Sequence, residues 1–330
     1  MGLLPSSKNK FSISRMKEAA SIFYDSLDSK SKRKALFHYL DGERIFWYYP
    51  PLNRHGLPLK DMTKEVRRLA FNLLETGLSS DAFNQTLQII NHELILKELE
   101  ARKGIKTFVR DPERYYFTIF GNPKNKDPWG WRVEGHHVSI HFSIWADKII
   151  SVTPLFLGAN PAEVQDGDSK GLRILKKRED LAFELINSMS KDQHYIATIY
   201  ENTPKDIITY NSSRVTVPVV EGISWDELKI GQQKLLKYLI GEYINQVNPE
   251  IAKPRLDYLD SNILRSIKFG WAGGFKHGEA YYYRIHGGNL FIELDNYQSG
   301  ANHVHSVWRD VENDFAQDVL RKHLLAYHVL

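Results

Sequence analysis

The sequence predicts a single α+β domain with a mainly antiparallel, twisted sheet that is flanked by helices. Two observations carry this prediction. Apolar residues recur at helical spacing through the first third of the chain, and short aromatic-rich runs with a period of two begin near Arg114. Because helices precede, separate and follow the runs of strands, an antiparallel sheet is favoured. We expect a flexible N-terminus (1–10), a helical subregion (11–104) and a sheet-containing core (105–330).

The helical third contains three expected helices. The first extends over residues 11–40, where apolar side chains such as Met16 and Phe23 recur at helical spacing. The second spans residues 63–75. The third begins after a pair of serines and spans residues 80–102, and a glycine follows each of these two helices as a stop signal.

The remaining two thirds alternate between strands and helices. Ser224 and Glu227 form a capping box that opens a helix ending near Asn245, and further helices are expected over 171–190 and 311–327. The expected strands cover residues 115–120, 129–144, 148–153, 195–200, 265–271, 279–286, 290–295 and 303–308. No linker divides the chain, so one domain is predicted.

Composition excludes several classes of function. The 44 basic and 40 acidic residues are spread along the chain without a basic stripe, so we expect no nucleic-acid partner. No stretch has the length and apolarity of a transmembrane helix, and the first residues lack the apolar run that would predict a signal peptide. We therefore expect a soluble, cytoplasmic protein without integral membrane contact. Residues 1–6 also fit the loose pattern for N-myristoylation, which applies only in a eukaryotic host.

Thirteen histidines are distributed unevenly, and two segments are rich in them. The first is residues 134–141 (EGHHVSIH) and the second is residues 303–305 (HVH), both in predicted strands. On a strand, residues two apart share a face at about 6.6 Å, and residues four apart are separated by about 13 Å. His303 and His305 can therefore converge on one ion, whereas His137 and His141 are too far apart to do so without help.

The predicted metal site combines His303 and His305 from one strand with His137 from a neighbouring strand. A carboxylate or a water molecule would complete it, and Glu134 and Asp310 are the nearest acidic residues in sequence. The chain has no cysteine, so a metal must be bound by His, Asp, Glu or water. A mainly imidazole set suits a divalent transition metal, and it does not distinguish zinc, iron or copper.

Two metal-free interpretations remain open. In one, the histidines form hydrogen bonds within the sheet, and the protein is a non-catalytic binder of a small ligand in an aromatic-lined pocket. In the other, residues 137–140 (HVSI) are half of a two-histidine phosphoesterase site, where two imidazoles act as acid and base. The second half is incomplete, because His305 occupies the position that should hold Ser or Thr.

Two arginines and a row of carboxylates are further candidates. Arg284 lies in a predicted strand and could bind an anionic substrate or pair with an acidic neighbour. Arg309 is followed by Asp310, Asp314 and Asp318, whose i, i+4 spacing predicts one helical face. These carboxylates could orient the histidines or supply a ligand. Compensation of the helix dipole is the alternative role.

Several motifs along the chain form a recognisable set, and they are residues 129–139, 153–161, 282–284 and 303–305, with Arg309, Asp310 and Asp314. Together they resemble an uncharacterised family, domain of unknown function number 3500. The resemblance extends from about Phe11 to the end of the chain, and it implies that both histidine segments belong to one site. In the family the position of His141 is usually asparagine, which implies that His141 is not an essential ligand.

Together these features predict a metal-dependent enzyme, a hydrolase or an oxidoreductase, with a mononuclear histidine-rich site. His137, His303 and His305 would be its ligands. Glu134 or His136 would act as a base or orient a ligand. The two arginines would hold an anionic group of a small-molecule substrate, and the reaction itself is left open.

Overall fold

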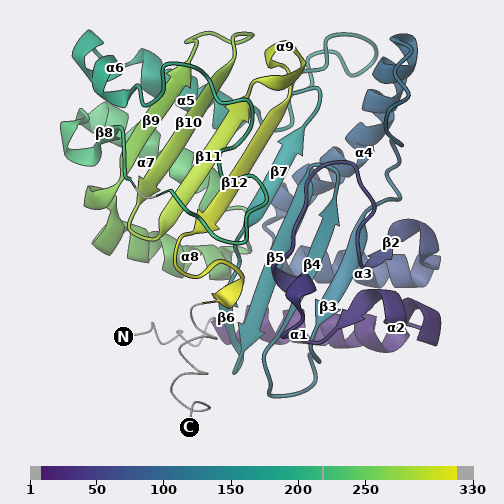
Figure 1. Cartoon of the computed structure of the whole chain (residues 1–330). Coiled ribbons are helices and arrows are strands. Elements are labelled where there is room, and N and C mark those ends of the chain that lie inside the picture. The colour runs from purple at the N-terminus through teal and green to yellow at the C-terminus, as the bar shows by residue number, and fades with distance from the viewer. Residues whose placement is uncertain (1–8, 218, 318–330) are drawn as a thin grey trace. The chain divides into compact units, whose positions relative to one another are not determined.

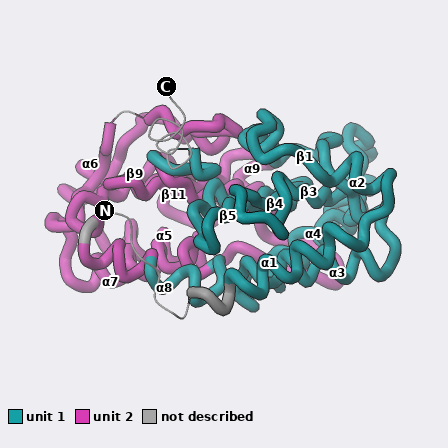
Figure 2. The backbone as a smooth tube through the Cα atoms, turned by 90° about the horizontal axis from the view of Figure 1, so that it is seen from below, with its two compact units in different colours: residues 1–155, 246–254, 312–330 teal, residues 156–245, 255–311 magenta. Residues whose placement is uncertain are grey.

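The computed structural model describes residues 9–217 and 219–317. The chain divides into two compact units, drawn in different colours in Figure 2. The first unit holds residues 1–155, 246–254 and 312–330, and the second holds residues 156–245 and 255–311. The predicted α+β class is confirmed, with mostly antiparallel strands and a helical N-terminal region. The expectation of a single domain stays a prediction.

The first unit begins with four helices (Figure 1). They are α1 (Asn9–Ser26), α2 (Ser29–Ala35), α3 (Lys64–Gly77) and α4 (Ser80–Arg102). The prediction of one helix over 11–40 was wrong, because Asp28 caps a new helix by accepting a hydrogen bond from the Ser31 amide at 2.7 Å. Thr63 and Ser79 cap α3 and α4 in the same way. α1 packs against α3 through buried apolar side chains.

The strands of the first unit follow the order β1-β3-β4-β5, with β2 paired to β3 and β6 paired to β5. They are β1 (Leu36–Phe37), β2 (Leu57–Pro58), β3 (Tyr116–Phe120), β4 (Trp129–Gly135), β5 (Val138–Trp145) and β6 (Lys148–Ser151). The short β1 runs parallel to β3, and the other pairs are antiparallel. β3, β4 and most of β5 are buried on both faces.

A hairpin turn interrupts what was predicted to be one strand over 129–144. Gly135 pairs with Val138, so His136 and His137 form a two-residue turn, and His137 has a positive φ of 62°. A Cβ atom on Gly135 would lie 2.1 Å from the Tyr115 ring, so only glycine allows this close approach. The Tyr115 hydroxyl donates to the His136 carbonyl at 2.8 Å and fixes the turn.

The second unit has the strand order β7-β12-β11-β10-β9-β8. These strands are β7 (Leu155–Ala159), β8 (Ile223–Ser224), β9 (Lys268–Gly273), β10 (Tyr281–Gly287), β11 (Leu290–Asn296) and β12 (Val304–Asp310). The pairs from β8 through β12 are antiparallel. Gly288, with a φ of 54°, lies in the hairpin turn between β10 and β11.

Helices α5 (Lys176–Asn187) and α7 (Ile230–Ile244) cover one face of this sheet (Figure 1). Tyr281 donates to Glu179 of α5 at 2.8 Å, and the hydroxyls of Tyr283 and Tyr243 of α7 are 2.6 Å apart. The remaining helices are α6 (Lys191–Ala197), α8 (Pro249–Tyr258) and the one-turn α9 (Gln298–Ala301). α7 begins at Ile230, because the capping box at Ser224 opens a single 3₁₀ turn.

Two further predictions of secondary structure were wrong. Residues 195–200 are not a strand, because Ser190 and Gln193 form a capping box that begins α6. Residues 311–317 are not a regular helix but a turn followed by a 3₁₀ turn, so Asp310 of β12 and Asp314 do not share a helical face. The rest of the expected C-terminal helix, including Asp318, and the N-terminal segment 1–8 lie outside the described residues.

None of the helices in the described ranges combines the length and the apolar character that crossing a membrane requires.

Candidate metal centre

Strands β10, β11 and β12 present a polar face. Residues directly opposite one another in antiparallel strands share a face. Three successive cross-strand rows on this face are therefore defined by the register, and they are Tyr282–Asp295–His305, Arg284–Glu293–Val307 and His286–Phe291–Arg309. All of their polar members are buried. Buried charged groups need partners, so something must cover this face.

The cover is the segment between α6 and β8, residues 198–222, which we call the covering loop (Figure 1). The structure describes all of it except residue 218. It supplies polar partners to four of the charged residues of the face. These contacts join Asp206 to His305, Thr209 to Glu293, Ser212 to Arg309 and Glu221 to Arg284.

His305 is held by two carboxylates. Its Nδ1 lies 2.8 Å from Asp206 Oδ1 and 3.5 Å from Asp295 Oδ1. Burial opposes the charged imidazolium, but the hydrogen bonds to Asp206 and Asp295 outweigh it and raise the pKa of His305 to about 9. With Nδ1 directed at the carboxylates, Nε2 is the nitrogen on the opposite side of the ring. A histidine oriented in this way is typical of metal sites.

His303 lies directly before β12, beside His305. Its amide donates to Asn296 Oδ1 at 2.9 Å, which anchors the start of the strand to the end of β11. The ring centroids of His303 and His305 are 4.6 Å apart. Phe156 of β7 packs on His305 with ring centroids 5.6 Å apart.

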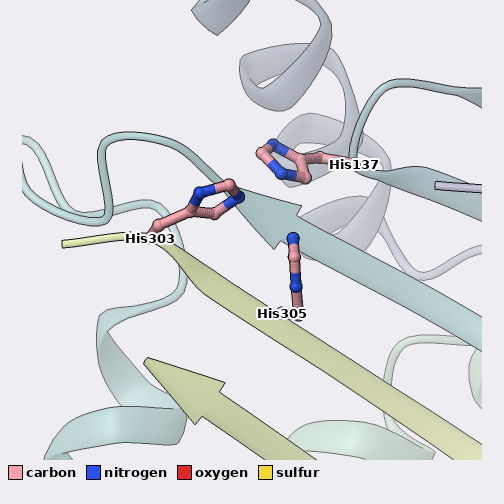
Figure 3. A group of neighbouring side chains, drawn as sticks. All are labelled: His137, His303 and His305. Atoms are coloured by element: carbon pink, nitrogen blue, oxygen red, sulfur yellow. The ribbon is translucent and has the colours of Figure 1, made fainter. Parts of the chain in front are cut away.

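Within the described residues of the second unit, three side chains could hold a metal ion, and they are Asp206, Asp295 and His305. Each offers one ligand atom, and these atoms lie within 4.8 Å of one another. Figure 3 draws His303 and His305 of this unit together with His137, which belongs to the first unit.

His136 and His137 stack on each other at the turn between β4 and β5, with ring centroids 3.7 Å apart. The Nδ1 of His136 forms a short hydrogen bond with the Glu93 carboxylate of α4. Arg110 lies 3.4 Å from the same nitrogen and pairs with Glu100 at 2.7 Å. His136 is thus held by a buried carboxylate, as His305 is.

Glu134 lies at the centre of a buried polar cluster in the first unit. It accepts hydrogen bonds from Ser139 Oγ at 2.8 Å and from the Tyr48 amide at 3.2 Å. The Nε atoms of Arg132 and Arg54 lie 3.4 and 3.8 Å from its Oε2. His141 belongs to this cluster, since its Nε2 lies 2.8 Å from Ser139 Oγ.

The remaining predicted residues lie on β10 and β12. Arg284 pairs with Glu221 at 2.7 Å and lines a cavity. Arg309 is completely buried and donates to the Ser212 carbonyl at 2.7 Å. Asp310, at the end of β12, accepts a hydrogen bond from Asn289 at 2.8 Å.

The acidic partners were not among the predicted site residues. Glu293 and Asp295 follow the alternation of β11, so a buried carboxylate pair in the run LFIELDN was a usable signal. Asp206 lies in an irregular loop and Glu93 lies on a long helix. Neither of these positions carries a pattern that links it to a histidine far away in the sequence.

The model of the family described as Protein of unknown function (DUF3500) matches residues 9–317, nearly the whole chain. No curated protein matches the chain, and no solved structure does. The chain therefore belongs to this family, and the resemblance noted from its motifs is confirmed.

Proposed function

We propose that this member of the DUF3500 family is a metal-dependent enzyme, a hydrolase or an oxidoreductase, that acts on a small anionic substrate. His137, His303 and His305 are its metal ligands. The observation that supports this most directly is the buried pair His303 and His305, whose ring centroids are 4.6 Å apart and of which His305 is held by two carboxylates. Three imidazoles suit zinc, iron or copper. Such an ion would activate water or bind oxygen at a remaining open position.

The surroundings of the imidazoles support ligation over a purely structural role. Asp206 and Asp295 orient His305 from the side opposite its Nε2, as carboxylates do for ligating histidines. His303 lies directly before β12 and His305 lies on it, two positions apart, a spacing that lets two rings reach one ion. The alternative group, Asp206 with Asp295 and His305, would use the Nδ1 of His305 instead. The variants below distinguish the two groups.

Other predicted residues keep roles in this proposal. His136, paired with Glu93, carries a proton to or from the substrate. Arg284 and Arg309 hold the anionic group of the substrate. Glu134 and Asp310 act by positioning their neighbours, because their carboxylates are hydrogen-bonded to Ser139 and Asn289.

Elemental analysis of the purified protein tests the metal centre. We expect about one equivalent of a transition metal in the wild type, and loss of most of it in a His303→Ala/His305→Ala double variant and in His137→Ala. If His137→Ala retains the metal and Asp295→Asn loses it, the metal ligands are Asp206, Asp295 and His305 instead. His55→Ala is the matched control, since that imidazole is 71% exposed and pairs with Glu43. Identical metal content in all variants would refute the proposal.

A specific observation also favours a second candidate, a non-catalytic protein that binds a small ligand. The second unit contains a cavity of about 550 Å³ between the covering loop and Arg284. Its volume lies within the range of ligand sites, roughly 300–1,000 Å³. A protein that binds no metal and still binds a ligand in this cavity would favour the second candidate.

A further inference from the structure

The cavity of the second unit lies between the covering loop and the polar face of the sheet. Its wall includes Tyr200, Thr209, Ser212 and Thr216 of the loop and Arg284 of β10. Among its lining residues in the described chain, Arg284 is the single cationic one. Hydroxyl groups dominate the polar part of the wall. The cavity is therefore suited to a ligand with one negative charge and several hydrogen-bonding groups.

Arg284 is completely buried, yet its hydrogen bonds are incomplete. Its Nη1 donates to the Tyr200 hydroxyl at 3.0 Å and its Nη2 donates to Glu221 Oε2 at 2.7 Å. Its Nε has no hydrogen-bond partner among the residues that the structure describes. A guanidinium binds a carboxylate best through two parallel N–H···O bonds, and Glu221 uses one donor. An unused buried donor costs free energy, so a partner that accepted a hydrogen bond from it would be favoured.

Glu221 occupies the position that such a partner would take. Its side chain is 43% exposed, whereas that of Arg284 is 0% exposed. A carboxylate at the solvent boundary is stabilised little by its ion pair, since the pair is screened and the side chain retains freedom. Replacing it with the carboxylate of a ligand keeps one negative charge beside Arg284. The exchange therefore leaves no buried charge unpaired.

We propose that this cavity binds a small hydroxylated monocarboxylate, such as a sugar acid, whose carboxylate displaces Glu221 from Arg284. Polar side chains of the wall, among them Asn211 and Thr216, would contact the body of the ligand. A dianionic phosphate is a poorer match, because one guanidinium and the nearby Glu221 would leave it undercompensated. The inference extends the proposed function by naming its substrate class. It rests on that function only through the role of Arg284, because ligand binding here requires no metal.

Calorimetric titration of the full chain with gluconate tests the proposal, with sorbitol as the neutral polyol of the same length. We expect saturable gluconate binding and at least about tenfold weaker sorbitol binding, because the carboxylate makes the charge-assisted bonds. Arg284→Lys should weaken gluconate binding about tenfold or more, since lysine cannot form the bidentate pair. Glu221→Gln should tighten it several-fold by removing the competing anion. Arg265→Lys and Glu184→Gln are exposed controls in the same unit.

The same titrations are repeated after treatment with a chelator. Equal binding with and without metal supports the cavity even if the metal centre fails, and metal content is measured separately. If Arg284→Lys does not fold, as judged by circular dichroism, the proposal is tested by the increase in gluconate affinity that is expected in Glu221→Gln. Equal affinity for gluconate and sorbitol, or no gluconate binding in both the wild type and Glu221→Gln, would overturn the proposal.

Discussion

The Nδ1 of His305 lies 2.8 Å from Oδ1 of Asp206, and this contact orients the imidazole ring. Asp295 supports the same nitrogen at 3.5 Å from the neighbouring strand. One loop residue and one strand residue thus hold a ring on a third element. Because the His305 ring is already held in place, little further conformational entropy is lost when it binds an ion.

Asp206→Asn should weaken metal binding by about 10- to 100-fold without abolishing it, because the carboxylate orients a ligand and is not one itself. Competition with a chromophoric chelator measures the affinity. Asp226→Asn, at an exposed position of the same unit, should leave the affinity unchanged. Complete loss of metal in Asp206→Asn would instead identify Asp206 as a ligand.

His137→Gly separates ligation from the backbone turn. His137 has a φ of 62°, a conformation that glycine adopts without strain, so the turn should persist. We expect loss of the metal with a change of less than about 1 kcal/mol in the free energy of unfolding measured in chelator. His137→Val, which is strained in the same conformation, should be clearly less stable. Full metal content in His137→Gly would contradict the assignment.

Glu134→Gln should destabilise the protein by about 3–5 kcal/mol, because it removes the charge between two buried arginines. Urea unfolding measures the change. The comparison variant is Glu65→Gln, which breaks an exposed pair with Arg68 on α3 and should cost less than about 0.5 kcal/mol. A loss of less than 1 kcal/mol in Glu134→Gln would show that Arg54 and Arg132 do not depend on this carboxylate.

Glu293 gives stability a defined pH dependence. Burial raises its pKa above the ordinary value of 4.5, against opposing hydrogen bonds from Thr209, the Ile208 amide and Tyr282. Its cross-strand neighbour Arg284 is already paired with Glu221. A carboxyl whose pKa is raised on folding stabilises the protein fully below pH 4.5, and this contribution is lost as the pH rises through the raised value.

Urea unfolding of the wild type and of Glu293→Gln between about pH 5 and 8 tests this linkage. The stability of the wild type relative to the variant should fall as the pH rises. Only the wild type has a carboxyl group at this position, and burial disfavours its ionised form in the folded protein. A relative stability that rises with pH would mean that the carboxylate is the favoured form in the folded protein.

Helices α3 and α4 of the first unit and most strands could be predicted because their signals are local. Thr63 and Ser79 stand directly before apolar helical repeats, and both cap the expected helices. The spacing of His303 and His305 also predicts that the two rings lie together, and their centroids are 4.6 Å apart. Each of these inferences needs only residues that are close in the sequence.

Other features depend on contacts that the sequence does not display. Asp206 is 99 positions from His305, and no periodicity marks it. The turn at His136 and His137 carries none of the Gly, Asn or Asp residues that usually signal a two-residue hairpin. The alternation on both sides of it therefore predicted one long strand. The turn depends on the packing of Tyr115 against Gly135, which is a tertiary contact.

The contacts of the covering loop have a consequence for amide hydrogen exchange. The amides of Ile208 and Thr209 both donate to the single carboxylate of Glu293, while Asp206 and Ser212 are tied to neighbouring rows of the same strands. Because the loop is bonded to the sheet at several positions, breaking one hydrogen bond does not expose the amides of Ile208 and Thr209 to solvent. The loop should therefore exchange as one cooperative unit, with protection closer to that of β11 than to that of an ordinary surface connection.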